Sequence, residues 1–389
     1  MGLVPTSLVE RHWRSALNEL AYGRLEFVAP NGEPHIAEGR NPGPNARFKI
    51  HEWDVLRRVM AKGDVALGED YIAGTWETDD IERLISLFLL NIGEFDKFAS
   101  GNLINRLAMV LNNNLVRRNS VRGSRRNIQD HYDVGNDFYS LWLDRSMTYS
   151  SALFADREIA LEDAQQQKYG RILERLAKAR ADVLEIGCGW GGFAERAAGE
   201  NHHVTGLTIS PAQFRFANER LGTKAEIRLE DYRKAKGTFD AIVSIEMFEA
   251  VGERYWPRYF QTIAERLKRG GRAIIQTIAI RDELFSAYRM QSDFIRQYVF
   301  PGGMLPSLKR FREEAERAGL KAVDAFRFGK DYAKTLREWS RRMQDRQADI
   351  FALGYDSRFL RNWEFYLGIC AAAFAVERTD VAQIELVHA

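Results

Sequence analysis

The sequence predicts a two-domain α/β protein whose larger, C-terminal part contains a doubly wound, Rossmann-like sheet. From about residue 180 onward, short β-branched runs alternate with amphipathic helical stretches, as in strand–helix–strand units with right-handed crossovers. One strand candidate also runs directly into a glycine-rich turn followed by a helical stretch. The 389 residues are enough for roughly two or three domains of about 150 residues.

Residues 1–115 are predicted to form a small α+β domain, with lipid binding or dimerisation as its expected role. We place its boundary in the polar, basic stretch 112–127, so that residues 116–389 form the second domain. Turn-forming residues separate the short elements of the first domain. The expected strands are Leu25–Val28 and Arg47–Ile50, and the expected helices are Trp53–Met60 and Ile81–Asn91. Turns are expected at Pro30–Gly32 and Asn41–Pro44.

Seven strands and several helices are expected in the second domain. The strands are Asp182–Ile186, His203–Leu207, Ala225–Leu229, Ala241–Ile245, Ala273–Ile278, Lys321–Phe326 and Ala382–Val387. The clearest later helices are Ser307–Ala318, Tyr332–Ala352 and Arg358–Val376. Gly319 follows the first of these helices at a position where glycine favours a helix stop.

Composition excludes several classes of protein. A net charge of +2 gives no global field for nucleic-acid binding. The two cysteines lie far apart without zinc-ligand spacing, which predicts neither a disulfide framework nor a metal site and suits a reducing cytoplasm. The N-terminus lacks a signal-peptide pattern, and the apolar runs are too short to span a bilayer. We therefore expect a cytoplasmic protein.

The segment Val183–Phe193 carries the most informative motif, because a buried strand enters a glycine-rich loop before a helix. Such a loop lets a cofactor approach the helix N-terminus, although a tight turn without a ligand is the plainer alternative. A dinucleotide-binding strand two usually ends in Asp or Glu, whereas Gly206–Gln213 offers hydroxyls and an amide. An acid lies in the first strand at Glu185, and Asp231–Tyr232 follow the third. This distribution favours S-adenosylmethionine over NAD.

Several ordered motifs together resemble the cyclopropane-fatty-acyl-phospholipid synthase family, which includes the mycolic acid cyclopropane synthases. The resemblance is good from about residue 120 onward and weaker over the first 115 residues. The motifs are His131–Tyr139, Met147–Phe154, Val183–Phe193, Gly206–Ser210, Glu246–Gly252 and Phe300–Gly303.

The resemblance implies a class I S-adenosylmethionine-dependent methyltransferase. Such an enzyme transfers a methyl group to the double bond of an unsaturated acyl chain in a membrane phospholipid, and then a proton is lost to close a cyclopropane ring. Gly252 and Phe300–Gly303 would shape the acyl tunnel. The cofactor residues that the resemblance implies are Tyr149, Ser150, Glu185, Gly187, Cys188, Gly189, Trp190, Gly191, Thr208, Ser210, Gln213, Asp231 and Tyr232.

In the family a bound bicarbonate is thought to be the base, held by a Cys, a Glu, a His-x-Ile segment and a Tyr. This chain keeps Glu249, Ile278 and Tyr332 at the matching positions. It departs at Ser151, where the Cys is expected, and at Gln276, where the His is expected. Serine and glutamine still form hydrogen bonds with anions, so bicarbonate stays a candidate ligand.

Glu246 stands where many members of the family carry a small residue, and the plant cyclopropane synthases look similar in having this Glu with a Gln on the following strand. If a helical turn begins there, Glu246 and Glu249 share a face. Two close carboxylates raise one pKa, which suits a proton acceptor. Our hypothesis is that Glu246 replaces or orients the base; the plainer alternative is a solvated residue at a helix start.

The residues leave more than one function open. A C-methyltransferase of the same family would leave a methyl or methylene branch, or a furan precursor. A small-molecule methyltransferase and a non-catalytic lipid-binding protein would each share the fold.

The arginines of 117–126 predict peripheral contact with anionic phospholipid at the inner face of the membrane, or else a solvated linker. The stretch Leu103–Leu115 predicts a membrane-resting amphipathic helix or domain core. A homodimer is also left open.

Overall fold

The protein is described by a computed structural model that covers residues 5–99, 134–176 and 178–389. These residues form two compact units. The N-terminal unit holds 5–99, 290–299 and 347–376, and the large unit holds 134–176, 178–289, 300–346 and 377–389. The expected boundary at 112–127, the stretches 103–115 and 117–126, and the beginning of the motif His131–Tyr139 lie outside the described residues.

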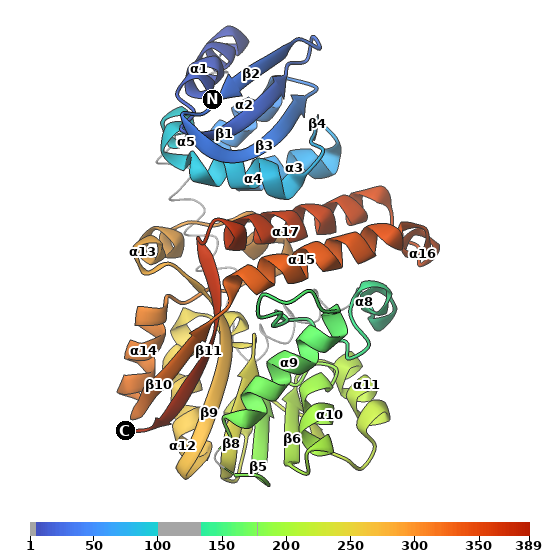
Figure 1. Cartoon of the computed structure of the whole chain (residues 1–389), viewed down its shortest axis with the longest axis vertical. Helices are drawn as coiled ribbons and strands as arrows, with labels where there is room; N and C mark the ends of the chain where they lie inside the picture. Colours follow the sequence, from blue (N-terminus) through green and yellow to red (C-terminus); the bar gives the residue numbers. More distant parts are fainter. Residues whose placement is uncertain (1–4, 100–133, 177) are drawn as a thin grey trace. The chain divides into compact units, whose positions relative to one another are not determined.

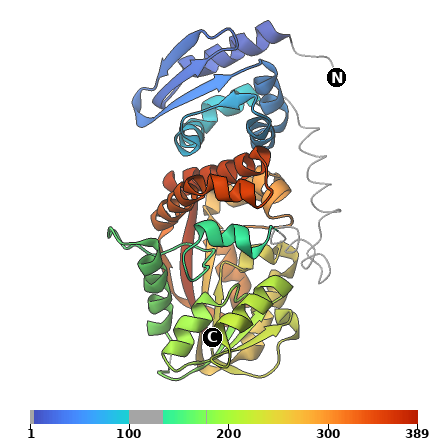
Figure 2. The ribbon, with the colours of Figure 1, turned by 90° about the vertical axis from the view of Figure 1, so that its right-hand side faces the viewer.

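The N-terminal unit contains a four-stranded sheet in the order β2-β1-β3-β4, and α4 packs against β1 and β3 (Figure 2). The expected turn at Asn41–Pro44 is wrong, since these residues begin β3. A Cβ on Gly43 would lie 2.7 Å from the backbone nitrogen of Gly23, so glycine there permits the close parallel pairing with β1. The elements are α1 (Thr6–Asn18), β1 (Tyr22–Val28), β2 (Pro34–Glu38), β3 (Asn41–Ile50), α2 (Asp54–Lys62), α3 (Asp64–Ala73), β4 (Trp76–Glu77), α4 (Ile81–Leu90), α5 (Ile92–Ala99), η4 (Ile295–Val299), α16 (Gln347–Ala352) and α17 (Ser357–Ala375).

The unit differs from the expected N-terminal domain because α17 belongs to it. This helix contacts α3 and α4. The Phe365 ring lies 5.8 Å from Tyr71 and 4.8 Å from Phe294, between ring centroids. At Gly368 a Cβ would lie 2.6 Å from Cγ2 of Ile81, so the glycine lets α17 approach α4 closely. The late segments 290–299 and 347–376 therefore complete an apolar core that the first hundred residues begin.

The large unit is a seven-stranded mixed sheet in the order β10-β11-β9-β8-β5-β6-β7. The expected doubly wound sheet is confirmed, and all seven expected strands are present. β11 runs antiparallel to both neighbours, whereas the five strands from β9 to β7 pair in parallel. The strands are β5 (Asp182–Ile186), β6 (His203–Thr208), β7 (Glu226–Leu229), β8 (Phe239–Ile245), β9 (Leu267–Ile280), β10 (Leu320–Arg327) and β11 (Thr379–His388).

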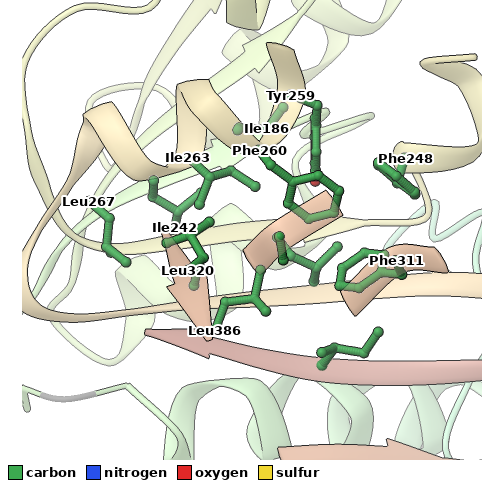
Figure 3. Close-up of a cluster of buried hydrophobic side chains, with 14 of the residues drawn as sticks. Ile186, Ile242, Phe248, Tyr259, Phe260, Ile263, Leu267, Phe311, Leu320 and Leu386 are labelled. Atoms are coloured by element: carbon green, nitrogen blue, oxygen red, sulfur yellow. The ribbon is translucent and has the colours of Figure 1, made fainter. Parts of the chain in front are cut away.

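Helices cover both faces of this sheet (Figure 1). Alternate residues of β5 point to opposite faces: Val183 packs with α9, α10 and α11, and Leu184 packs with α12 and α14. Figure 3 shows the second face, where Tyr259, Phe260 and Ile263 of α12 lie over the sheet. The elements are α8 (Asn136–Trp142), α9 (Leu161–Glu174), α10 (Gly192–Gly199), α11 (Pro211–Leu221), η1 (Tyr232–Lys234), η2 (Phe248–Ala250), η3 (Glu253–Tyr255), α12 (Trp256–Arg266), α13 (Asp282–Met290), α14 (Leu308–Arg317) and α15 (Gly329–Asp345).

The strand order reverses at β5, because β6 pairs on one side of it and β8 on the other. In open α/β sheets, ligands bind outside the carboxyl ends of the strands at such a switch point. The glycine loop follows β5 and Glu246 follows β8, so both lie at this point of the sheet. None of the helices described is both long and apolar enough to cross a bilayer.

Candidate functional site

The glycine loop turns sharply at the end of β5. Gly187, Gly189 and Gly191 all have positive φ angles, of 84°, 54° and 84°. The backbone N–H groups of Gly187 and Cys188 both donate to the Leu207 carbonyl, which ties the loop to β6. At Gly189 a Cβ would meet nothing within 4 Å. The loop therefore exposes backbone beside α10. Because Gly189 has no side chain, a ligand can approach this backbone directly.

Hydrogen bonds among polar side chains order the turn after β6. Thr208 Oγ1 donates to Gln213 Oε1 at 2.9 Å, and the Gln213 N–H donates to Ser210 Oγ at 3.3 Å. Ser210 thereby caps the N-terminus of α11, with Pro211 in the first turn. All three polar residues are buried. Much of their hydrogen-bonding capacity serves this cap, so the turn is already ordered without a ligand.

Asp231 is held by an arginine that the sequence reasoning missed. Arg233 donates to both carboxylate oxygens, at 2.8 and 2.6 Å. Although burial opposes the change, the hydrogen bonds from Arg233 keep the pKa of Asp231 below its usual value. The Tyr232 ring packs edge-on against Tyr259 at 5.6 Å. An anion and an aromatic ring therefore lie side by side after β7, as the sequence predicted, with the anion already paired.

The turn Tyr149–Ser151 is held by α9. Gln165 Nε2 donates to the Ser150 carbonyl at 3.0 Å, and Lys168 Nζ donates to Ser150 Oγ at 2.6 Å. The Tyr149 ring packs within 5.3 Å of Trp339 on α15, between centroids. Sequence reasoning missed Lys168. Its signal was a lysine in the core-facing stripe of α9, at i+4 from Ala164 and i−4 from Ile172.

Glu246 is the centre of the site. It directly follows β8 with φ +50°, a left-handed conformation that costs a residue with a Cβ about 1–2 kcal/mol. Its Oε1 accepts the Ser151 N–H at 2.9 Å and Gln276 Nε2 at 2.7 Å. Its Oε2 accepts the Tyr332 hydroxyl at 2.6 Å. One carboxylate therefore receives three hydrogen bonds, from residues of a turn, a strand and a helix.

Glu249 lies beside Glu246, although not on a shared helical face as supposed, because the short helix η2 begins only at Phe248. Its Oε1 accepts the Thr277 hydroxyl at 3.0 Å and the Ile278 N–H. Its buried Oε2 has no hydrogen-bond partner among the described residues. Burial, followed by the charge of Glu246, raises the pKa of Glu249 to about 8. Burial also raises the pKa of Glu246. The pair therefore holds protons more firmly than free carboxylates do.

A chain of side chains fixes the orientation of the Gln276 amide. Arg171 donates to Gln383 Oε1 at 2.9 Å, so Gln383 turns its Nε2 towards Gln276 Oε1, at 3.1 Å. The Gln276 amide must then present its own N–H to Glu246. Sequence reasoning missed Arg171 and Gln383, because they lie on α9 and on β11, far from Gln276 in the chain.

Ser151 contributes its backbone rather than its side chain. The buried hydroxyl donates to the Ala152 carbonyl at 3.0 Å, while the N–H reaches Glu246. The segment that follows is fixed from α15, where Thr335 Oγ1 accepts the Ala152 N–H at 3.0 Å. Because α15 also carries Tyr332, one helix positions both the turn and a donor to Glu246.

Glu185, on β5, is buried, and its Oε2 lacks a hydrogen-bond partner in the described structure. Burial raises the pKa of Glu185 to about 8, while Lys168 acts in the opposite direction. A buried carboxylate oxygen without a partner, next to the open glycine loop, fits a cationic or hydrogen-bond-donating cofactor such as S-adenosylmethionine. Within the described residues, no group of three or more His, Cys, Asp or Glu side chains could hold a metal ion.

The expected acyl-tunnel segments adjoin Glu249 through the backbone. The Met304 N–H, just after Phe300–Gly303, donates to the Glu249 carbonyl at 2.9 Å. Gly252 has φ +76° and opens the helix η3. Trp190 donates to Asn136 Oδ1 at 2.8 Å, which connects the glycine loop to α8. The role of these segments as a tunnel stays a prediction.

Comparison with known proteins assigns this site to a family. Residues 119–384 match the family described as mycolic acid cyclopropane synthetase. The chain is 36% identical to the tuberculostearic acid methyltransferase of Mycobacterium tuberculosis, over 87% of this chain and 82% of that protein. It is 34% identical to the cyclopropane-fatty-acyl-phospholipid synthase of Escherichia coli, over 97% and 94% of the two chains.

Solved structures agree with this assignment. The cyclopropane synthase MmaA2 from Mycobacterium tuberculosis superposes with a TM-score of 0.63 at 28% identity, covering 67% of this chain and 97% of that one. The mycolic acid cyclopropane synthase CmaA1, complexed with SAH and CTAB, gives a TM-score of 0.63 at 29% identity, with the same coverage. The chain therefore belongs to the mycolic acid cyclopropane synthetase family and is an S-adenosylmethionine-dependent methyltransferase.

Proposed function

We propose that the chain methylates the double bond of an unsaturated fatty acyl chain in a membrane phospholipid, and that the product is a cyclopropane fatty acid. The name of the Escherichia coli relative, which aligns over 94% of its length, supports this substrate and product. The carrying observation is the Glu246 carboxylate, which three donors hold at the site. The substrate lies in a bilayer, so the proposal includes peripheral membrane association, with residues 117–126 as its candidate.

The residues proposed to hold S-adenosylmethionine surround the carboxyl ends of β5, β6 and β7. When bound, this cofactor supplies an electrophilic methyl group. The glycine loop lets the cofactor approach the loop backbone closely, and Glu185 offers a buried carboxylate oxygen. Thr208–Gln213 and Asp231–Tyr232 complete the set after the next two strands. Tyr149 and Ser150 adjoin it from the turn that α9 holds.

The proposed role of Glu246 is to accept the proton. An alkene that gains a methyl cation becomes a carbocation, and a negative charge nearby stabilises that cation. Transfer of a proton from the new methyl group to the Glu246 carboxylate leaves an electron pair that closes the ring. Ser151, Gln276 and Tyr332 direct their donors at this carboxylate. The side chain of Glu246 thus takes the hydrogen bonds that the resemblance assigns to bicarbonate.

A second candidate is a C-methyltransferase of the same family. The 36% identity to the tuberculostearic acid methyltransferase favours it, as do Ser151 and Gln276 in place of the expected Cys and His. Both reactions share the carbocation and differ in which proton leaves. Loss of a proton from the new methyl closes a ring, whereas loss from a chain carbon next to the cation leaves a methyl-branched alkene. A methylene branch requires a 1,2-hydride shift that first moves the cation to the methyl-bearing carbon, and then loss of a methyl proton.

The product distinguishes the two candidates. We expect that expression in a host without its own cyclopropane synthase, fed methyl-labelled methionine, gives a membrane fatty acid one labelled carbon heavier. A product that resists mild hydrogenation and gives ring fragments in mass spectrometry supports the cyclopropane. A labelled product that keeps its unsaturation moves the assignment to the branch-forming enzyme. The absence of any labelled lipid contradicts acyl methylation.

A second prediction concerns the cofactor. We expect Gly189→Ala to weaken S-adenosylmethionine binding at least about tenfold, the equivalent of ~1.4 kcal/mol. The new Cβ meets no protein atom within 4 Å, so it would face an approaching ligand. Gly319→Ala is the matched control, because Gly319 also has a positive φ (+78°) and open space around its Cβ. Equilibrium binding and thermal unfolding measure both variants. Equal cofactor affinities would contradict the placement.

A further inference from the structure

Lys168 is a buried cation that the proposed mechanism has not used. Its relative exposure is 0%. Its Nζ donates to Ser150 Oγ at 2.6 Å and lies 4.6 Å from the centroid of the Tyr169 ring. It makes no direct ion pair with any described carboxylate. Burying an ammonium group costs free energy, and a single hydroxyl does not repay that cost. The neighbouring electrostatics must therefore account for a lysine here.

Carboxylates from three other elements act on this ammonium group. The attraction is largest from Glu246 after β8, and smaller from Asp144 before the Tyr149–Ser151 turn and from Glu185 on β5. Asp144 is already bonded to the backbone N–H groups of Ser146 and Thr148. Burial lowers the pKa of Lys168, and these three anions oppose that change. Lys168 in turn opposes the rise that burial gives the pKa of Glu246.

Consecutive residues of one turn connect the cation to the carboxylate. Lys168 binds the side chain of Ser150, and the N–H of the next residue, Ser151, binds Glu246. Gln165 stands one turn before Lys168 on α9 and holds the Ser150 carbonyl. The same helix carries Arg171, which begins the series that orients Gln276. α9 therefore supports two of the three donors to Glu246.

We propose that Lys168 is a positioning residue of the methyl-transfer site, one that holds the Ser150 hydroxyl and keeps the Glu246 carboxylate ionised. The inference rests on the proposed function, because it assigns Glu246 as the proton acceptor. A base must be ionised before it can take a proton, and burial alone favours its protonated form. An internal cation offsets this effect without itself contacting the substrate, for as long as Lys168, whose pKa burial lowers to about 7, stays protonated.

The test is an infrared pH titration of the protein without lipid or cofactor. The carbonyl band of protonated Glu246 is identified by its loss in Glu246→Gln. As the pH rises, this band disappears when Glu246 ionises. We expect the band of Lys168→Gln to disappear at a pH higher by about one unit or more, because the carboxylate loses an opposite charge. Lys168→Met, which keeps an apolar stem, gives the same shift. Ser150→Ala leaves the band near its original position, because the charge remains.

Lys178→Gln is the matched control, since Lys178 is an exposed lysine of the same unit, paired with Asp240. A Glu246 band that titrates alike in wild type, Lys168→Gln and Lys168→Met would overturn the proposal. The same coupling can be measured from the lysine, without a lysine variant. In nitrogen-15 NMR spectra of the lysine side chains, we expect Glu246→Gln to lower the pKa of one buried lysine. If no lysine resonance responds, the coupling is absent.

The titration uses no substrate, so it reads this coupling even if the chain methylates another compound. The acidic limb of kcat/KM in Lys168→Gln gives the functional reading. We expect this limb to move upward with the infrared band. A moved band with an unmoved limb would show that Glu246 is not the base, which contradicts the proposed function and leaves the lysine–glutamate coupling in place.

Discussion

Glu246→Gln is expected to lower kcat by a factor of about 10² to 10⁴, the range that a general base contributes. The amide keeps the size of the side chain but cannot accept the proton that the acyl cation must lose. Affinity for S-adenosylmethionine is expected to change little, because Glu246 is not among the proposed cofactor residues. Initial rates on vesicles of unsaturated phospholipid, together with equilibrium cofactor binding, measure the two effects separately.

Glu226→Gln is the control for this substitution, because Glu226 is an exposed glutamate that pairs with Arg228 on β7. Glu246→Ala extends the test, since it leaves the Ser151, Gln276 and Tyr332 donors without their carboxylate. We expect added bicarbonate or formate to restore part of its activity, and the wild type to be indifferent to both. A wild-type rate that depends on bicarbonate would show that an external anion, and not Glu246, is the base.

The pH dependence is expected to be equally large. Burial, followed by the charge of Glu246, raises the pKa of Glu249 to about 8, and burial raises the pKa of Glu246 as well. A carboxylate with a raised pKa is protonated, and inactive as a base, over more of the acidic range. We therefore expect kcat/KM to increase with pH, with an acidic limb that lies above the ordinary glutamate pKa. On the acid side of that limb kcat/KM should fall about tenfold per pH unit.

Glu249→Gln tests the cause of this dependence. Interacting carboxylates titrate as a pair, so removal of one charge lowers the apparent pKa of the other. The acidic limb of kcat/KM should move down by about one unit. The profile is measured from pH 5.5 to 9 in buffers of constant ionic strength, with protein stability followed in parallel. A limb that stays at the ordinary glutamate pKa in the wild type would contradict the assignment.

The strands of the large unit could be predicted because each is a short apolar, β-branched run between turn residues. β9 was underestimated, since its first residues, Leu267–Arg272, are mostly polar and glycine-rich. Segment membership was harder to predict. The apolar pattern of α17 shows that one face is buried, but not that Tyr71 and Ile81 bury it. Periodicity reports burial and leaves the partner open, so late segments were assigned to the wrong neighbours.

The site shows the same division. The structure brings together Glu249 and Tyr332, which match the family pattern, and Glu246 and Gln276, which were singled out because they depart from it. The sequence did not indicate that Ser151 acts through its N–H, because side-chain identity says nothing of backbone direction. The supporting residues were missed as well. A buried lysine or an amide on a distant strand becomes visible only when tertiary contacts are known.

The left-handed backbone of Glu246 has an evolutionary consequence. Glycine would adopt φ +50° without the cost of about 1–2 kcal/mol that a side chain incurs. One nucleotide change converts either glutamate codon into a glycine codon. The replacement would relieve this backbone cost, remove the built-in carboxylate and leave its donors free for a dissolved anion. A lineage can therefore move between a base built into the chain and one taken from solution by a single mutation, with backbone strain and independence from solute supply opposing each other at one position.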